Sequence, residues 1–309
     1  MASKILIGPS SFAAIDRTPM NRLIDAGYDV VDNPYKRKLT KEELLNLLKD
    51  DVEGLIAGLE TIDREVLEKS HIQVISRVGA GISNVDIEAA RDLGILVFNT
   101  PDAPTNAVAE LTIGAMLSLL RMIPLMDKAL HDGQWKKTIG LQLQGKTVAI
   151  IGIGRIGRRV AELLSPFGVR ILVVDPCVDE STCVGFLKIT LSAALQEADI
   201  ITIHSSGHDC IIGEKEFTHM KKGAYLLNVA RGGVISEQAL IKAIENGTVA
   251  GAWLDTFEEE PYKGPLCNCR NVILTPHVGS YTAECRLQME NEAVDNLLNY
   301  LKNQKGERS

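Results

Sequence analysis

Three features that would assign this chain to common protein classes are missing from its sequence. It has no long basic cluster: 33 Lys and Arg are outnumbered by 40 Asp and Glu, which gives a net charge of −7. It has no long apolar run either. The most apolar stretch, residues 107–120, contains Glu110 and ends before Arg121, whereas a membrane-spanning helix needs about 20 apolar residues. These absences argue against a nucleic-acid partner and against a membrane partner.

Two further features are missing: a cysteine pattern that would bind a metal, and a signal peptide. The six cysteines are scattered, and only Cys267 and Cys269 lie close together, without a second pair that would complete a zinc site. The apolar part of the N-terminus, residues 5–7, is too short for a signal peptide and is typical of a first strand. We therefore expect no metal, and a cytoplasmic protein with reduced thiols.

The chain does contain a glycine-rich motif, and the rest of its organisation follows from it. The apolar run 147–151 is typical of a buried parallel strand, and it leads into Gly152-Ile153-Gly154-Arg155-Ile156-Gly157 and then into a helical pattern. In a dinucleotide-binding unit the first glycine forms the tight turn, the second lets the backbone approach the pyrophosphate, and the third lets the helix pack on the strand. The helix N-terminus then faces the phosphates.

An acidic residue strengthens this interpretation. The next strand, expected at 170–174, ends in Asp175, which follows Gly157 by about the spacing of the acid that binds the adenosine ribose. A carboxylate accepts hydrogen bonds from the ribose hydroxyls and repels a 2′-phosphate. Because Pro176 and Cys177 follow rather than Arg, the motif favours NAD over NADP. The alternative is a glycine cluster in an α/β turn beside a solvated strand-end Asp.

Short apolar strands and amphipathic helices alternate along the whole chain, which predicts α/β architecture with two Rossmann-like, doubly wound parallel sheets and a cleft between them. Before residue 100 we expect strands at 4–7, 29–32, 54–57, 73–77 and 96–99. From 146 onward we expect six, at 147–151, 170–174, 199–203, 224–228, 249–253 and 272–274. One long helix is expected over 105–130 and a final amphipathic helix over 281–302, which returns to the first domain. The expected domains are 1–100 with 282–309, and 101–281.

Three polar groups follow apolar strands in the second half of the chain. Arg231 follows the strand at 224–228, Glu260 lies in the segment after 249–253, and His277 follows 272–274. Ligands of doubly wound sheets bind outside the carboxyl ends of the strands, so Arg231, His277 and either Asp255 or Glu260 are expected to converge near the nicotinamide. Arg231 would bind the carboxylate of a 2-hydroxy or 2-oxo acid. His277 would exchange a proton with the oxygen on C2, and Glu260 would fix the imidazole tautomer. Taken singly, each has an ordinary alternative: a loop ion pair, a turn residue and a solvated acidic turn.

With these motifs the whole chain resembles the D-isomer-specific 2-hydroxyacid dehydrogenases, and among them the D-3-phosphoglycerate dehydrogenase-like members. The most specific segments are 148–157, 228–233, 254–261, 275–279, and Arg77-Val78-Gly79-Ala80-Gly81 followed by Asn84-Val85-Asp86. The resemblance implies a flavodoxin-like substrate domain, an NAD-binding Rossmann domain, and a homodimer whose interface helix begins in 107–120.

The resemblance also implies roles for individual residues. The catalytic set would be Arg231, Glu260 and His277. The substrate carboxylate would meet the backbone of Gly79, Ala80 and Gly81 as well as Arg231. Residues implied to contact NAD are Gly152, Gly154, Arg155, Ile156, Gly157, Asp175, Ser205, Val229, Ala230, Arg231, Asp255, His277 and Gly279, with Asp255 reaching the nicotinamide carboxamide.

The substrate stays open. Phosphoglycerate enzymes of this family carry an Arg after the strand near 54–57, where this chain has Ala57-Gly58-Leu59-Glu60. The implied reaction is NAD-dependent hydride transfer at C2 of a D-2-hydroxy or 2-oxo acid. The 3-phosphoglycerate/phosphohydroxypyruvate pair is one candidate, and a glyoxylate or hydroxypyruvate reductase is another. A non-enzymatic, NAD-sensing protein like the corepressors of this fold is the alternative from a different class.

Overall fold

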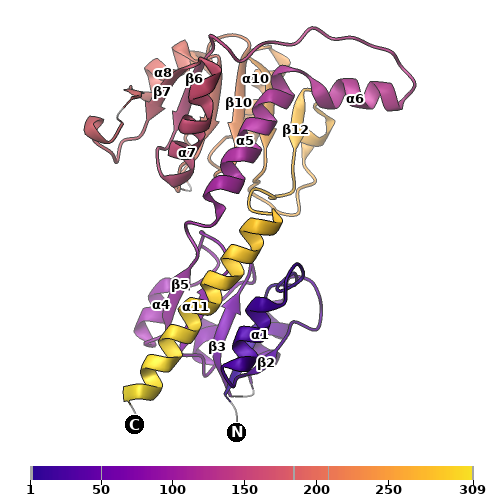
Figure 1. The fold of residues 1–309 in the computed structure, drawn as a ribbon. Helices are drawn as coiled ribbons and strands as arrows, with labels where there is room; N and C mark the ends of the chain where they lie inside the picture. The colour runs from indigo at the N-terminus through magenta and orange to yellow at the C-terminus, as the bar shows by residue number, and fades with distance from the viewer. Residues whose placement is uncertain (1–2, 50, 184, 208, 308–309) are drawn as a thin grey trace. The chain divides into compact units, whose positions relative to one another are not determined.

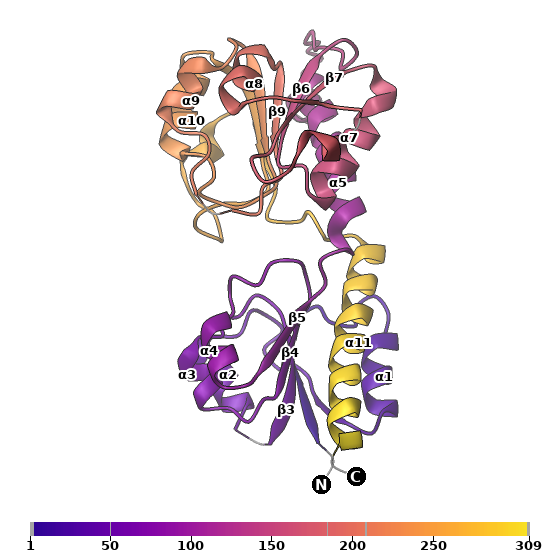
Figure 2. The same cartoon turned by 90° about the vertical axis from the view of Figure 1, so that its left-hand side faces the viewer.

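The computed structural model describes residues 3–49, 51–183, 185–207 and 209–307. The chain divides into two compact units, Met1–Pro104 with Ser280–Ser309 (the first unit) and Thr105–Gly279 (the second unit). Each unit is built on one parallel sheet with helices on both faces (Figures 1 and 2), so the predicted α/β class with two parallel sheets is confirmed.

The first unit has a five-stranded sheet in the order β2-β1-β3-β4-β5, the flavodoxin-like arrangement. Helices α1 and α11 cover one face, and α2, α3 and α4 cover the other (Figure 2). The strands are β1 (Lys4–Ile7), β2 (Asp29–Val31), β3 (Val52–Ala57), β4 (Val74–Arg77) and β5 (Leu96–Asn99), and the helices are α1 (Thr18–Asp25), α2 (Lys41–Leu47), α3 (Arg64–Glu68), α4 (Ile87–Asp92) and α11 (Ala283–Glu307).

Local sequence explains where several of these helices begin. Thr40 and Glu43 form a reciprocal capping box at the start of α2, and the side chains of Asp63 and Asp86 cap α3 and α4. Helix α11 begins two residues later and ends five residues later than the expected 281–302. Because α11 packs on β3 and β4, the last helix completes the fold formed by the first hundred residues.

The second unit has a seven-stranded parallel sheet in the order β12-β11-β10-β9-β6-β7-β8. Successive strands are added on one side of β6 up to β8 and on its other side from β9 onward. Its strands are β6 (Thr147–Ile151), β7 (Arg170–Val174), β8 (Leu187–Lys188), β9 (Ile200–Ile203), β10 (Ala224–Asn228), β11 (Val249–Leu254) and β12 (Val272–Leu274). Its helices are α5 (Pro104–Leu120), α6 (Ile123–His131), α7 (Arg155–Leu164), α8 (Leu191–Glu197), α9 (Glu214–His219) and α10 (Glu237–Glu245), with 3-10 turns at Ser165–Phe167, Glu180–Cys183 and Pro265–Asn268. The prediction of six strands missed β8, which is only two residues long.

The prediction of one helix over 105–130 is wrong, because the helix is broken into α5 and α6, bent by 66°. Met122 takes a left-handed conformation at φ 52°, and Pro124 in the first turn of α6 has no backbone N–H to continue a helical ladder. The returning segment satisfies the end of α5, since Leu141 N donates to Leu120 O at 2.8 Å. Among the described residues no single helix is both long and apolar enough to cross a membrane; only this bent pair, taken together, meets that length and composition.

Candidate functional site

The glycine loop links β6 to α7 in the second unit, and its three glycines differ in what surrounds them. Gly152 has φ 92°, and a Cβ there would lie 2.8 Å from the backbone of His204. A Cβ at Gly157 would overlap the carbonyl oxygen of Gly152, so helix α7 packs on the strand end only without a side chain. A Cβ at Gly154 would meet no protein atom within 4 Å. The open space over Gly154, at the N-terminus of α7, is where a phosphate group can approach the backbone.

Asp175 follows β7, the strand beside β6, and its carboxylate is fixed against this loop. Oδ2 accepts the N–H of Ile153 at 2.9 Å, and Oδ1 accepts the N–H of Cys177 at 2.9 Å. Each carboxylate oxygen has two lone pairs, so Asp175 retains acceptor capacity for a ligand hydroxyl. The next two side chains, Pro176 and Cys177, carry no positive charge.

Two residues whose backbone lies beside Gly152 each have a buried polar side-chain atom without a hydrogen-bond partner among the described residues. These atoms are Nδ1 of His204 and Oγ of Ser205, directly after β9. His204 bonds Thr202 through Nε2 at 2.9 Å, and burial lowers the pKa of His204 to about 3, so the ring is neutral near pH 7. Buried polar atoms normally find partners. The residues present at this edge therefore fit a bound polar ligand such as a dinucleotide.

The segment after β10 is shaped by Asn228, to which the sequence prediction assigned no role. Its Oδ1 accepts the N–H of Ala230 at 3.0 Å, and its Nδ2 donates to the carbonyl of Arg231 at 2.9 Å. The loop that carries Val229, Ala230 and Arg231 is thus fixed by the side chain that ends the strand. The half-buried guanidinium of Arg231 donates to the carbonyl of Ala230 at 2.7 Å.

Glu260 and His277 are in contact. Nδ1 of His277 lies 2.9 Å from Oε2 of Glu260, and Oε1 of Glu260 accepts the N–H of Phe257 at 3.1 Å. His277 takes a left-handed conformation at φ 53°, which L-residues rarely adopt outside turns and functional sites. Its side chain is 45% exposed. With Nδ1 directed at a carboxylate, Nε2 is the ring atom left for a ligand.

Arg231 is connected to this pair through the backbone. A Cβ at Gly232 would overlap Phe257 and Glu258, so the strand-end loop after β10 packs directly on the segment that Glu260 binds. The carboxyl-end loops of β10, β11 and β12 therefore carry Arg231, Glu260 and His277 at one edge of the sheet.

Asp255 organises the segment that carries His277. It is 1% exposed, and Oδ1 accepts the hydroxyl of Thr275 at 2.6 Å and the N–H of Val278 at 2.9 Å, while Oδ2 accepts the N–H of Gly279 at 2.9 Å. Thr275 in turn accepts the indole N–H of the fully buried Trp253 at 2.9 Å. The sequence prediction includes Thr275 in the segment 275–279 but assigns it no role, because a threonine before a proline gives no signal of such a bond. Three of the acceptor positions of Asp255 are therefore occupied.

The predicted substrate loop lies in the first unit, after β4. Gly79 has φ 132°, its N–H donates to the hydroxyl of Thr100 at 2.8 Å, and its carbonyl accepts the N–H of Thr100 at 3.1 Å. The carbonyl of Ala80 accepts the side-chain amide of Asn99 at 2.7 Å. The end of β5 thus holds the loop that contains Gly79, Ala80 and Gly81.

Comparison with known proteins identifies the family. Residues 113–279 match the family described as D-isomer specific 2-hydroxyacid dehydrogenase, NAD binding domain. The chain belongs to this family.

Individual relatives agree with this result. The chain is 41% identical over 260 residues to D-3-phosphoglycerate dehydrogenase of Methanocaldococcus jannaschii, covering 80% of this chain and 49% of the relative. It is 39% identical over 280 residues to glyoxylate reductase of Thermofilum pendens, covering 85% and 82%. In structure it is similar to the TT0316 protein from Thermus thermophilus, with a TM-score of 0.89, 32% identity and 97% of each chain covered. The chain spans about half the length of the phosphoglycerate dehydrogenases that it matches.

The family match agrees with the residues of the second unit, which present an open glycine loop, a ribose-spaced acid and unpartnered buried polar atoms. NAD is the cofactor of this family domain. Among the described residues no group of three or more His, Cys, Asp and Glu side chains is placed to hold a metal ion.

Proposed function

We propose that this protein is an NAD-dependent D-2-hydroxyacid dehydrogenase that interconverts a 2-oxo acid and its D-2-hydroxy acid. The observation that carries the proposal is the 2.9 Å contact between His277 and Glu260 at the carboxyl edge of the sheet that also carries the glycine loop. Relatives named D-3-phosphoglycerate dehydrogenase and glyoxylate reductase support this reaction class.

In the proposed mechanism the side chains of the second unit bind and polarise the oxo acid. Arg231 binds the carboxylate and stabilises the charge that develops on the C2 oxygen. NADH, when bound, supplies the hydride. His277 donates a proton from Nε2 to the C2 oxygen as C2 is reduced, and in the reverse direction it accepts that proton. Glu260 stabilises the imidazolium and keeps Nδ1 protonated.

Cofactor and substrate contacts follow from the same proposal. The first unit would be the substrate domain, with the backbone of Gly79, Ala80 and Gly81 on the substrate carboxylate, and the second unit the NAD-binding domain. The NAD contacts would come from Gly152, Gly154, Arg155, Ile156, Gly157, Asp175, Ser205, Val229, Ala230, Arg231, Asp255, His277 and Gly279. Since Asp255 already accepts three hydrogen bonds, we assign it mainly to holding residues 275–279.

A panel of 2-oxo acids tests the proposal. Glyoxylate, pyruvate, hydroxypyruvate, phosphohydroxypyruvate and 2-oxoglutarate are each mixed with enzyme and NADH or NADPH, and absorbance at the nicotinamide wavelength is followed. We expect oxidation of NADH by at least one acid and a preference for NADH. Preference for phosphohydroxypyruvate would assign the phosphoglycerate reaction, and preference for glyoxylate or hydroxypyruvate would assign the reductase. No oxidation with any acid, together with NADH-dependent capture of a protein, would replace the enzyme with an NAD-sensing binding protein.

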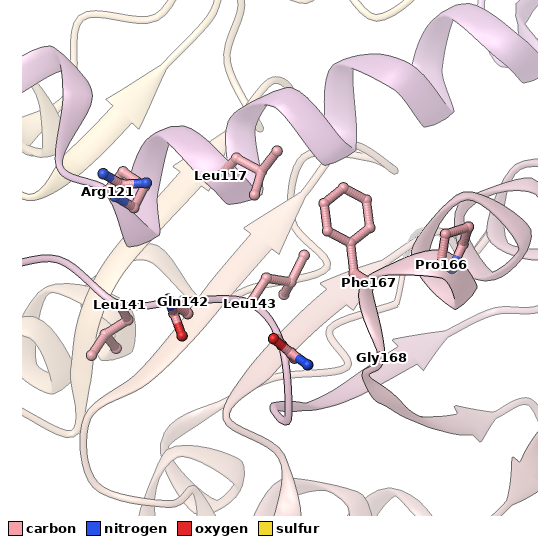
Figure 3. A pocket seen from close by; sticks show the side chains of 9 residues that line it. Leu117, Arg121, Leu141, Gln142, Leu143, Pro166, Phe167 and Gly168 are labelled. Atoms are coloured by element: carbon pink, nitrogen blue, oxygen red, sulfur yellow. The ribbon is translucent and has the colours of Figure 1, made fainter.

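We also propose that the protein is a homodimer formed through the second unit. Helix α6 and the segment after it extend away from the sheet of their own unit (Figure 1), and they expose Trp135 (81%) and Ile139 (96%). A hollow of about 470 Å³ lies at the base of this arm, between α5 and residues 141–144 and 166–168, with Leu117, Leu143 and Phe167 around it (Figure 3). Exposed large apolar groups on one segment favour association, and a second copy presents the same arm.

Sedimentation measurements test the dimer. We expect a dimer at micromolar concentration that the double substitution Trp135→Ala/Ile139→Asp converts to monomer, and a monomeric wild-type protein would contradict the proposal.

All six cysteines are free thiols, which supports a reducing compartment such as the cytoplasm.

A further inference from the structure

Helix α11 carries a buried ion pair in the first unit. Nη2 of Arg286 lies 2.8 Å from Oε1 of Glu290, one turn further along the helix, and the two side chains are only 10% and 4% exposed. Burial raises the pKa of Glu290. Because removing two charges from water carries a penalty of several kcal/mol per ion, a pair in this position calls for a reason beyond helix stability.

The pair binds the segment that follows β1, residues 8–14, which we call the β1 loop. The second oxygen of Glu290, Oε2, accepts the backbone N–H of Ala13 at 2.9 Å, and Nη2 of Arg286 donates to Oγ of Ser11 at 3.2 Å. Ala13 has φ 56°, a conformation that a residue with a Cβ adopts only when its surroundings impose it. The ion pair is therefore the clamp on a strained loop.

The packing of α11 does not depend on this clamp. Buried apolar side chains such as Met289, Ala293 and Leu297 are 0–1% exposed, and the helix packs on β3 and β4. Arg286 and Glu290 instead direct their polar atoms to a segment more than 270 positions away in the sequence. Their effect is thus on the shape of the β1 loop.

The β1 loop lies at the carboxyl edge of the sheet, and contacts through Gly58 and Asn84 lead from it toward the predicted substrate loop. A Cβ at Gly58, after β3, would lie 3.3 Å from Cα of Pro9. The carbonyls of Gly58 and Glu60 accept the side-chain amide of Asn84 at 3.2 and 2.7 Å, and Asn84 follows the Gly79–Gly81 segment by three residues. Ligands of parallel sheets bind at this edge, so the β1 loop lies on the side of the sheet where the proposed carboxylate site at Gly79–Gly81 would be.

We propose that Arg286 and Glu290 are positioning residues that hold the β1 loop as the surface contacting the C3 substituent of the 2-oxo acid. This inference rests on the proposed function. Every side chain from Pro9 to Ala14 is uncharged, so the contact acts through shape and through the hydroxyl group of Ser10, whereas the hydroxyl of Ser11 is bound by Arg286. Substrates that possess a C3 atom depend on the clamp, whereas glyoxylate, which has none, does not.

The test compares KM and kcat for glyoxylate, pyruvate and hydroxypyruvate in the wild type and in the double variant Arg286→Met/Glu290→Met. Replacing a buried pair by apolar groups of similar volume is often tolerated by the fold, and this variant removes both bonds to the loop. We expect KM for pyruvate and hydroxypyruvate to rise about tenfold, which corresponds to about 1.4 kcal/mol, with KM for glyoxylate and kcat for all three changed less than threefold. Ser11→Ala, which removes one bond and leaves the pair, should shift KM in the same direction by a smaller factor and serves if the double variant does not fold.

The matched control is Asp295→Asn on the same helix. Asp295 pairs with Arg22 of α1 and does not bond the β1 loop, so its KM values should stay within twofold of wild type. A KM ratio between pyruvate and glyoxylate that is unchanged in the double variant and in Ser11→Ala, in an enzyme that turns over both acids, would overturn the positioning role and leave the proposed function intact. Absence of turnover by the wild type with every acid would remove both.

Discussion

Nδ1 of His277 lies 2.9 Å from Oε2 of Glu260, and the other oxygen of that carboxylate is held by the backbone N–H of Phe257. The backbone N–H of Phe257 fixes the carboxylate of Glu260, and the carboxylate in turn orients the imidazole of His277. Nε2 of the ring can then face a reacting oxygen. An arrangement of this kind is what general acid–base catalysis by histidine requires.

Replacing His277 by Ala should mainly lower kcat. General acid–base catalysis contributes about 10²- to 10⁴-fold to rate, and we expect a loss of kcat in this range. His219→Ala is the matched control, since His219 is partly exposed on α9 and bonds only local groups. Steady-state kinetics check the outcome, and near-normal kcat in His277→Ala would remove the proposed proton transfer.

Replacing Glu260 by Gln keeps the size of the side chain and removes its charge. The amide no longer stabilises an imidazolium, so kcat should fall by about 10-fold or more, less than in His277→Ala because the base itself remains. Glu259→Gln, at the neighbouring exposed position, is the control. Equal kcat values for Glu260→Gln and wild type would show that the 2.9 Å contact has no part in the reaction.

Substitution of the loop glycines should separate folding from cofactor binding. A Cβ at Gly157 would overlap the Gly152 carbonyl, whereas a Cβ at Gly154 meets open space. Gly157→Ala should therefore lower the free energy of unfolding by about 1–3 kcal/mol, the usual cost of overpacking. Gly154→Ala should unfold at nearly the wild-type temperature but bind NADH more weakly. Thermal unfolding and fluorescence titration with NADH measure the two effects, and a reversed pattern would contradict the proposed place of the phosphates.

Asp175 should set the preference between the two nicotinamide cofactors. Asp175→Ser removes the charge that would repel a 2′-phosphate, so the ratio of kcat/KM for NADH to that for NADPH should fall by about tenfold or more, since one charged contact contributes about 1.5–3 kcal/mol. Asp179→Ser, on the exposed segment after β7, should leave the ratio unchanged. A ratio that is the same in Asp175→Ser and wild type would place the ribose elsewhere.

Stability should respond to pH through Glu60, which is 1% exposed and accepts the N–H of Gly58 at 2.8 Å. Burial raises the pKa of Glu60 above 4.5, although the positive charges of Arg77 and Lys38 oppose the shift. Because the native state then retains a proton that the unfolded state has lost, this contribution to stability is complete below pH 4.5 and is lost as pH rises through the native pKa. In Glu60→Gln this side chain does not ionise, so the variant does not lose this stability as pH rises. Its free energy of unfolding relative to wild type should therefore increase from pH 4.5 upward.

Urea denaturation of both proteins between about pH 4 and 8 measures this difference. Glu43→Gln is the control, because Arg37 lowers the pKa of Glu43 to about 2; Glu43 is then ionised in both the native and the unfolded state above about pH 5, and the stability difference between Glu43→Gln and wild type should be constant there. A constant stability difference between Glu60→Gln and wild type would show that Glu60 does not titrate differently in the native state.

The sequence predicts the strands of this fold well, because buried parallel strands consist of continuous runs of apolar residues. β6, β7, β10 and β12 have the predicted bounds. The break at Met122 was missed, since an apolar Met-Ile-Pro segment keeps the helical period while the left-handed turn depends on the returning Leu141. β8 was missed because two residues form no pattern.

Less of the site can be predicted. Arg231, Glu260 and His277 are recognisable as polar groups after apolar strands, and a glycine loop is recognisable from its spacing. The bonds of Asn228 and Thr275 depend on loops meeting in space, and no local pattern encodes them. The clamp formed by Arg286 and Glu290 joins opposite ends of the chain, so sequence periodicity gives no sign of it. The roles of the site residues remain predictions that the experiments above test.

The position of α11 has a consequence for how the protein is made. The second unit, Thr105–Gly279, is one uninterrupted stretch, and a ribosome releases all of it before the final helix. The first unit is begun earlier but lacks the helix that covers β3 and β4 until residues 280–309 emerge. Domains usually fold in order of synthesis; here the order is inverted, and the middle of the chain is the part able to fold first.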